Sequence, residues 1–173
     1  VSVGLTGTAR LRGSLRSAFE ALGARVRCIQ PARLEDACTA PELADCLAGG
    51  WNWIAFTSPN GAEIFCRLLR AAGYDLRRLA GIRLAAVGPG TAQMLARQGL
   101  FADLVPGRHD TASLGGALAG ACSPGDRVLL AGAENAGSAP EQALREAGIS
   151  CERRVLYRVI PGPLDDRPVD YLV

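Results

Sequence analysis

The chain has 173 residues, of which 49% are hydrophobic and 21% are charged, as is typical of a globular protein with one ordinary core or two small ones. Its formal net charge of +2 disfavours a nucleic-acid binder, which usually presents a strongly basic surface. The longest apolar runs are far shorter than the roughly 20 residues that cross a bilayer, so no membrane contact is expected. A cytoplasmic enzyme or small-molecule-binding protein is the default expectation.

The predicted elements alternate between strand and helix along the chain. Strands are predicted at residues 1–5, 26–29, 53–56, 83–87, 102–106, 127–130, 151–159 and 169–173. Helices are predicted at residues 11–22, 41–47, 61–72, 91–98, 111–121 and 139–147, with Thr111 opening the fifth. Strands separated by helices of this length require crossovers, which predicts an α/β fold with parallel sheets covered by helices.

The domain organisation is expected to be interrupted. The strands that begin at Trp53 predict one complete flavodoxin-like lobe, inserted at residues 34–161. Residues 1–33 and 162–173 are expected to form part of an outer lobe, whose remainder would follow residue 173. Two extended passages, residues 26–31 and 155–161, are expected to pair as a two-stranded ribbon between the lobes.

Three strand-to-helix connections of the inserted lobe are unusually polar: Thr57-Ser58-Pro59-Asn60-Gly61, Gly88-Pro89-Gly90-Thr91, and residues 132–138, "GAENAGS". Because the carboxyl ends of parallel strands meet at one edge of a sheet, these connections should lie together, where ligands bind in open α/β folds. Each combines a hydroxyl or amide with glycine, so backbone N–H groups could approach a carboxylate or phosphate closely. The alternative for each connection is a capped turn.

Other chemistries fit the sequence less well. "TSPNG" lacks the glycines of a nucleophile elbow, and the chain has no lysine for a phosphate-binding loop. His109, in a polar loop, could be a general base or an exposed side chain, and Glu134 a general acid or a solvated one. All 19 other basic residues are arginine, whose planar fork suits carboxylates, although a GC-rich genome would give the same bias.

The six cysteines form no C-x-x-C pair and lie within apolar patterns, so buried, reduced thiols are expected rather than a metal site or disulfides. Tyr157 is placed by strand alternation on the face that also presents Val155 and Val159, near the predicted lobe junction. Either its hydroxyl is satisfied by ordinary packing, or its polar tip faces a cleft between lobes.

Taken in order, these segments resemble the uroporphyrinogen-III synthase family. The resemblance rests on "WNWIAFTSPNGAEIF", "IRLAAVGPGTAQMLARQGLFADLVP", the helix start at Thr111, and "RVLLAGAENAGSAPEQALREAGISCERRVLYRV". Each motif is short, but their order and spacing together are specific. The resemblance runs from about residue 1 to the end of the chain, with little signal in residues 161–168.

The resemblance implies a monomeric enzyme with two flavodoxin-like lobes joined by a ribbon. Family members act on hydroxymethylbilane, a linear tetrapyrrole with eight carboxylates. They remove its hydroxyl as water, invert the terminal ring through a spiro intermediate and close uroporphyrinogen III. No metal or organic cofactor is implied, and the only partner is this acidic small molecule.

The resemblance and the polar corners together indicate the substrate-binding residues Thr6, Thr57, Ser58, Asn60, Gly61, Gly88, Gly90, Thr91 and Asn135. Tyr157 matches the tyrosine that is proposed to assist departure of the hydroxyl. Hydrogen-bond assistance is the expected role, because a phenol is a weak acid.

One corner departs from the family pattern. The family commonly has Thr-Arg-Pro after the first strand, whereas this chain has Thr6-Gly7-Thr8, so a cation is missing there unless Arg10 or Arg12 replaces it. A rival interpretation is a non-catalytic two-lobe module that binds an acidic small molecule.

Overall fold

The computed structural model describes residues 1–6, 9–29, 32–162 and 167–173. It is a mixed α/β fold with parallel sheets, in agreement with the fold class predicted from the sequence. The chain divides into two compact units, one made of Val1–Leu34 with Val159–Val173 and the other of Glu35–Arg158. Each unit is described by itself below. No helix among the described residues is long and apolar enough to cross a membrane.

The smaller unit contains a three-stranded sheet in the order β2-β1-β8, in which β1 pairs in parallel with both neighbours. Its elements are β1 (Ser2–Leu5), α1 (Ala9–Ala21), β2 (Arg25–Cys28) and β8 (Tyr171–Leu172). Val3 and Leu5 are buried, whereas both residues of β8 are exposed. The central strand therefore supplies most of the buried surface of this sheet.

The larger unit is built around a sheet in the order β3-β7-β6-β4-β5. The strands are β3 (Ala32–Asp36), β4 (Trp53–Phe56), β5 (Arg83–Ala86), β6 (Arg127–Ala133) and β7 (Ser150–Pro161). The helices are α2 (Ala40–Leu47), α3 (Pro59–Ala71), the 3-10 turn η1 (Leu76–Leu79), α4 (Pro89–Arg97), α5 (Thr111–Ala121) and α6 (Ala139–Glu146). From β7 to β5, adjacent strands are parallel.

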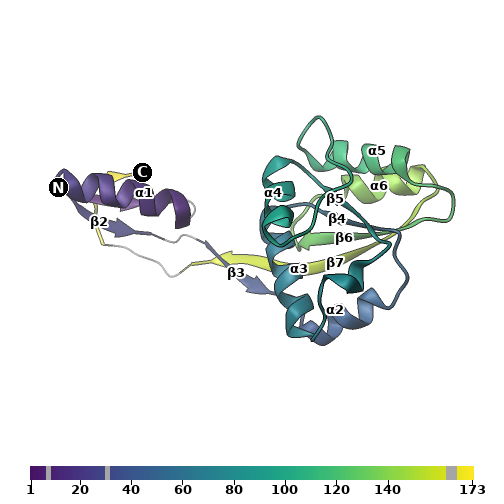
Figure 1. The fold of residues 1–173 in the computed structure, drawn as a ribbon. Coiled ribbons are helices and arrows are strands. Elements are labelled where there is room, and N and C mark those ends of the chain that lie inside the picture. The colour runs from purple at the N-terminus through teal and green to yellow at the C-terminus, as the bar shows by residue number, and fades with distance from the viewer. Residues whose placement is uncertain (7–8, 30–31, 163–166) are drawn as a thin grey trace. The chain divides into compact units, whose positions relative to one another are not determined.

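Helices cover both faces of this sheet, with α5 and α6 on one face and α2 and α3 on the other (Figure 1). The central strand β4 is buried throughout because its side chains alternate between two cores. Ile54 and Phe56 join the core beneath α2, α3 and α4, whereas Trp53 and Ala55 join the core beneath α5 and α6. Phe56 also packs edge-to-face on Phe65 of α3.

The strand order reverses direction between β4 and β6. From β4 the chain moves outward to β5 and to a bridge at Leu104, and it then returns to the opposite side of β4 as β6. After β4 the chain enters α3 on one face, and after β6 it enters α6 on the other. Such a switch point is where open α/β sheets form ligand-binding crevices.

Two predictions about strands are corrected. Residues 25–28 do not pair with the return strand, because they form β2 and their backbone groups bond to β1 within the same β-α-β unit. The neighbour of β7 is instead β3, which the sequence did not indicate (Figure 1). Residues 102–106 form no full strand, and only Leu104 makes a bridge, to Ala85. Residues 30–31, which fall within the predicted ribbon, lie outside the described residues.

One smaller prediction is confirmed and another is corrected. The fifth helix begins at Thr111 as predicted, and its N-cap is Asp110, whose carboxylate accepts a hydrogen bond of 2.7 Å from the Ser113 N–H group. That N–H group is the main reason why the pKa of Asp110 is lowered. Cys28 is exposed, not buried, because it lies on β2 away from the core. All six cysteines are free.

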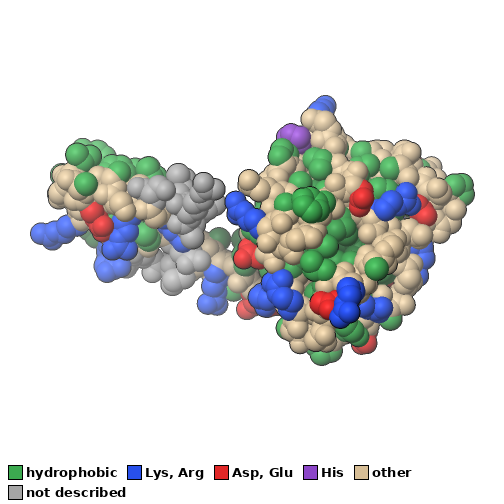
Figure 2. Space-filling view, viewed as in Figure 1, with side chains coloured by type: hydrophobic (Ala, Val, Ile, Leu, Met, Phe, Trp, Pro, Cys, Tyr) green, Lys and Arg blue, Asp and Glu red, His purple; other side chains and the backbone are tan. Residues whose placement is uncertain are grey.

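Acidic and basic side chains are interspersed on the face of the larger unit seen in Figure 2. No large single-sign field covers this face, in keeping with the net charge of +2.

Candidate functional site

The three polar corners follow three adjacent strands, β5, β4 and β6, at the carboxyl edge of the larger sheet. Glycine allows them to pack against one another. A Cβ atom added at Gly61 would lie 3.4 Å from the Gly132 Cα atom, and one added at Gly90 would lie 3.8 Å from Pro59 Cγ. The corners therefore form one continuous patch, with the β4 corner in its centre.

A partly buried pair of hydroxyl groups lies at the centre of this patch. The Ser58 Oγ and Tyr157 hydroxyl oxygens are 2.9 Å apart, and Tyr157 is only 4% exposed. Ser58 also caps α3, since its oxygen accepts a hydrogen bond of 3.0 Å from the Gly61 N–H group. The helix start thus fixes the serine, and the serine in turn fixes the phenol.

The direction of the hydrogen bonds decides what this pair can do. Ser58 Oγ accepts from Gly61, and in its contact with Tyr157 either hydroxyl can be the donor, so one arrangement directs the Ser58 proton to the Tyr157 oxygen. In that arrangement the phenol keeps its proton for a third group, such as a departing hydroxyl. The pair can therefore present a donor from a packed, low-dielectric position without any charged side chain.

A β-bulge brings Tyr157 to this position. Gly132 pairs with Val155, but the next residue, Ala133, pairs with Tyr157, so that Leu156 is the extra residue. Leu156 and Tyr157 are consequently both buried in the core on the Ala133 side of the sheet. Strict alternation, which predicted that Tyr157 shares a face with Val155, is wrong here because bulges redirect side chains.

Thr57 follows β4 directly and lies against the end of β6. Its N–H group donates to the Ala131 carbonyl at 3.3 Å, and its hydroxyl makes no hydrogen bond with any described residue. A Cβ atom at Gly132 would overlap Thr57 Oγ1. The glycine is therefore needed for close approach of two corners at the switch point, rather than for a positive φ angle.

Replacing Gly132 with alanine is expected to lower the free energy of unfolding by about 1–3 kcal/mol, because the added methyl group would overlap the Thr57 side chain. Urea unfolding followed by circular dichroism measures the change. Gly137→Ala is the matched control, since a Cβ atom there would meet nothing within 4 Å. Most of the loss should disappear in a Thr57→Ala background, and an undiminished loss there would contradict the overlap.

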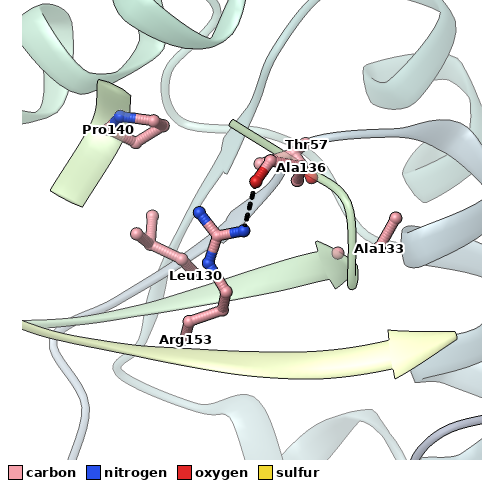
Figure 3. Close-up of a pocket in the computed structure, with 7 residues that line it drawn as sticks. Thr57, Leu130, Ala133, Ala136, Pro140 and Arg153 are labelled. Atoms are coloured by element: carbon pink, nitrogen blue, oxygen red, sulfur yellow. Dashed lines mark hydrogen bonds between the residues drawn. The ribbon is translucent and has the colours of Figure 1, made fainter. Parts of the chain in front are cut away.

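The third corner is held by Arg153 of β7, which sequence reasoning did not single out. Its guanidinium donates to the Ala136 carbonyl at 2.6 Å and to the Gly137 carbonyl at 2.8 Å, and it pairs with Glu141 of α6. Figure 3 shows the side chain extending from β7 toward Ala136. Each nitrogen of this guanidinium has a hydrogen-bond partner. Arg153 therefore orders the loop and has no unpaired nitrogen left for a ligand.

The pocket beneath this loop, lined by Thr57, Gly132 and Arg153 among others, has a volume of about 10 Å³ (Figure 3). It would hold roughly one water molecule. It is therefore a packing void at the switch point, and any larger ligand must bind above the corners.

The second corner differs from the first because no side chain caps α4, whose N-cap is Gly88. Thr91 is 2% exposed, and its hydroxyl makes no hydrogen bond with a described residue. His109 packs directly on this corner, since a Cβ atom at Gly88 would lie 2.9 Å from the His109 Cβ atom. His109 is exposed, which agrees with the second of the two alternatives predicted for it. No local sequence signal placed it beside Gly88.

The remaining predicted site residues occupy separate positions. Asn60 and Asn135 are exposed on the first and third corners, and neither side chain has a hydrogen bond with a described residue. Thr6 belongs to the smaller unit, where its hydroxyl donates to the Val173 carbonyl at 3.0 Å. Gly7 and Thr8 lie outside the described residues, as does the side chain of Arg10.

Within the described part of the chain, no three His, Cys, Asp or Glu side chains gather as a metal ion would require. The thiols of Cys38, Cys46 and Cys66 are buried, and burial raises the pKa of each. Burial also raises the pKa of the half-buried Cys122 and Cys151 thiols. These five thiols are therefore poor nucleophiles.

Comparison with known proteins identifies this arrangement. The model of the family described as "Uroporphyrinogen-III synthase HemD" matches residues 13–170. The chain belongs to the uroporphyrinogen-III synthase HemD family. This agrees with the resemblance found in the sequence.

Two relatives of this family show moderate identity. A protein from Ruminiclostridium josui named "Porphyrin biosynthesis protein HemD" is 34% identical over 107 residues, which are 62% of this chain and 21% of that protein. A "Uroporphyrinogen-III synthase" from Chlorobaculum parvum is 32% identical over 127 residues, which are 68% of this chain and 51% of that protein. The chain thus spans about half or less of these relatives.

Solved structures of the same family have a similar fold. A mutant uroporphyrinogen III synthase from Thermus thermophilus matches with a TM-score of 0.66 at 25% identity, covering 94% of this chain and 64% of that chain. The Helicobacter pylori structure titled uroporphyrinogen-III synthetase matches with a TM-score of 0.58 at 15% identity, covering 96% and 65%, and supports the fold alone.

Proposed function

We propose that the polypeptide containing this chain is a uroporphyrinogen-III synthase. It cyclises hydroxymethylbilane with loss of water and inversion of the terminal pyrrole ring. The observation that supports this most directly is the partly buried Ser58–Tyr157 hydroxyl pair, at the centre of three polar corners in a chain of this family.

In this proposal, Tyr157 donates a hydrogen bond to the departing hydroxyl of the substrate. Ser58 is a positioning residue that supplies a hydrogen bond to the phenol oxygen and so leaves the phenol proton free for the substrate. No strong acid is present in the pair, so most of the selectivity comes from holding one folded conformer of the bilane.

The substrate-binding residues are proposed to be those of the corners together with Thr6. Unsatisfied hydroxyls at Thr57 and Thr91 and backbone amides at the starts of α3 and α4 suit the carboxylates of an acidic tetrapyrrole. Asn60, Gly61, Gly88, Gly90 and Asn135 complete the proposed set. The two compact units correspond, in this proposal, to two flavodoxin-like lobes of a monomer. The proposed lobe boundaries at residues 34 and 161 lie near the divisions after Leu34 and after Arg158.

The product isomer tests the proposal. The polypeptide encoded by the gene that contains this sequence is incubated with hydroxymethylbilane, and the oxidised porphyrins are separated by chromatography. Uroporphyrin III is the expected main product, while the blank without protein should give isomer I. Isomer I alone would overturn the proposal, and tight binding of the tetrapyrrole in that case would support the non-catalytic alternative.

A further inference from the structure

We propose that Arg158, positioned by Glu134, is an additional binding residue for a substrate carboxylate, an inference that rests on the proposed function. Arg158 follows Tyr157 on β7, and Glu134 lies in the third corner, directly after the end of β6. The Arg158 Nε atom lies 2.9 Å from Glu134 Oε1, and the Glu134 N–H group donates to the Tyr157 carbonyl at 3.0 Å. The backbone at Glu134 is thus tied to β7 at Tyr157, the residue directly before Arg158.

Two arginines of β7 contact the third corner, and they differ in what they can still bind. Arg153 uses Nε, Nη1 and Nη2 to hold the loop and Glu141. Arg158 uses only Nε, and its two terminal nitrogens have no partner among the described residues. Because a guanidinium binds a carboxylate best through two parallel N–H groups, the free end of Arg158 can accept a second carboxylate without releasing Glu134.

Exposure and charge favour the same role. The side chains of Arg158 and Glu134 are 52% and 55% exposed, so a ligand can reach them, and an exposed ion pair contributes little to stability by itself. An acidic residue beside a binding site for a polycarboxylate would repel that ligand unless it were neutralised. Arg158 neutralises Glu134 and still presents donors, whereas Glu134 limits the number of orientations that the guanidinium adopts.

Arg158→Gln is expected to raise the KM for hydroxymethylbilane about tenfold while kcat changes less than twofold, since a charge-assisted hydrogen bond at a partly exposed position is lost. Arg158→Lys should recover part of the affinity. Arg145→Gln, at the end of α6 away from the third corner, is the matched control and should leave KM unchanged.

Glu134→Gln separates binding from a merely structural ion pair. If Arg158 binds substrate, this change should leave KM equal or lower, because the amide oxygen of glutamine can still accept the Arg158 Nε hydrogen bond while a repelling charge is removed. If the pair only orders the loop, Glu134→Gln should raise KM as Arg158→Gln does, and that result would overturn the inference. An unchanged KM in Arg158→Gln would overturn it as well.

Direct binding distinguishes a failure of this inference from a failure of the proposed function. Calorimetric titration with uroporphyrin III, which carries eight carboxylates, should show weaker binding to Arg158→Gln than to the wild type, with a smaller dependence on salt. This comparison remains valid if the wild type makes no isomer III. Equal affinities of the two proteins for uroporphyrin III would exclude the carboxylate contact whatever the reaction proves to be.

Discussion

Replacing Tyr157 with phenylalanine is expected to lower kcat for formation of uroporphyrinogen III by roughly 10- to 100-fold, with little change in KM. The ring would still fill its place in the core, where Tyr157 is 4% exposed, but no donor would remain for the departing hydroxyl. The rate of isomer III formation, measured at saturating substrate, tests this. A rate within about twofold of wild type would exclude a leaving-group role.

Two companions make the Tyr157 result interpretable. Tyr74→Phe removes a phenol from an exposed turn beside Arg78 and should leave the rate unchanged. Ser58→Ala should lower the rate through Tyr157, and it should also cost about 1 kcal/mol of stability because it removes the cap of α3. The double variant should react only slightly more slowly than Tyr157→Phe. If the rate losses of the two single variants instead multiply in the double variant, the serine does not act through the phenol.

Gly115→Ala is expected to lower the free energy of unfolding by about 3 kcal/mol, the largest stability loss that we predict. Gly115 lies on the buried side of α5, and an added Cβ atom would be 2.6 Å from the Pro140 Cα atom and 3.1 Å from the Ala143 Cβ atom. The first of these is backbone of α6, which cannot rotate away. Chemical unfolding measured beside the wild type gives the change.

The adjacent residue supplies a control with the opposite sign. Gly116 lies in the same helix, is exposed, and an added Cβ atom there would meet nothing within 4 Å. Gly116→Ala should therefore stabilise the protein by about 0.5–1 kcal/mol through helix propensity alone. Similar effects of the two substitutions would show that α5 and α6 do not approach as closely as described.

Local sequence patterns predicted the helices and most strands of the larger unit, because apolar spacing and glycine positions reflect burial along single elements. They also placed the three corners on one edge, since parallel strands leave no other arrangement. The edge strand β3 was missed because its five residues are all exposed and show no apolar pattern. The start of the fifth helix at Thr111 was predicted correctly, and its cap is the preceding residue, Asp110.

The contacts that define the site were less accessible to sequence reasoning. Ser58 and Tyr157 are 99 positions apart, and their contact depends on strand order and on a bulge that no motif announces. Arg153 and Arg158 appear equivalent in the sequence, and only the positions of the Ala136 and Gly137 carbonyls make one of them saturated. Motifs therefore indicated which segments form the site, whereas long-range packing determines what each side chain does.

Because of the bulge opposite Ala133, the position of Tyr157 depends on the number of residues in β7 as well as on their types. Deleting Leu156 would remove the extra residue and restore regular pairing there. Substitution scans preserve chain length and so cannot reveal this dependence. Single-codon deletions between Arg153 and Tyr157 should therefore be tolerated far less than substitutions there.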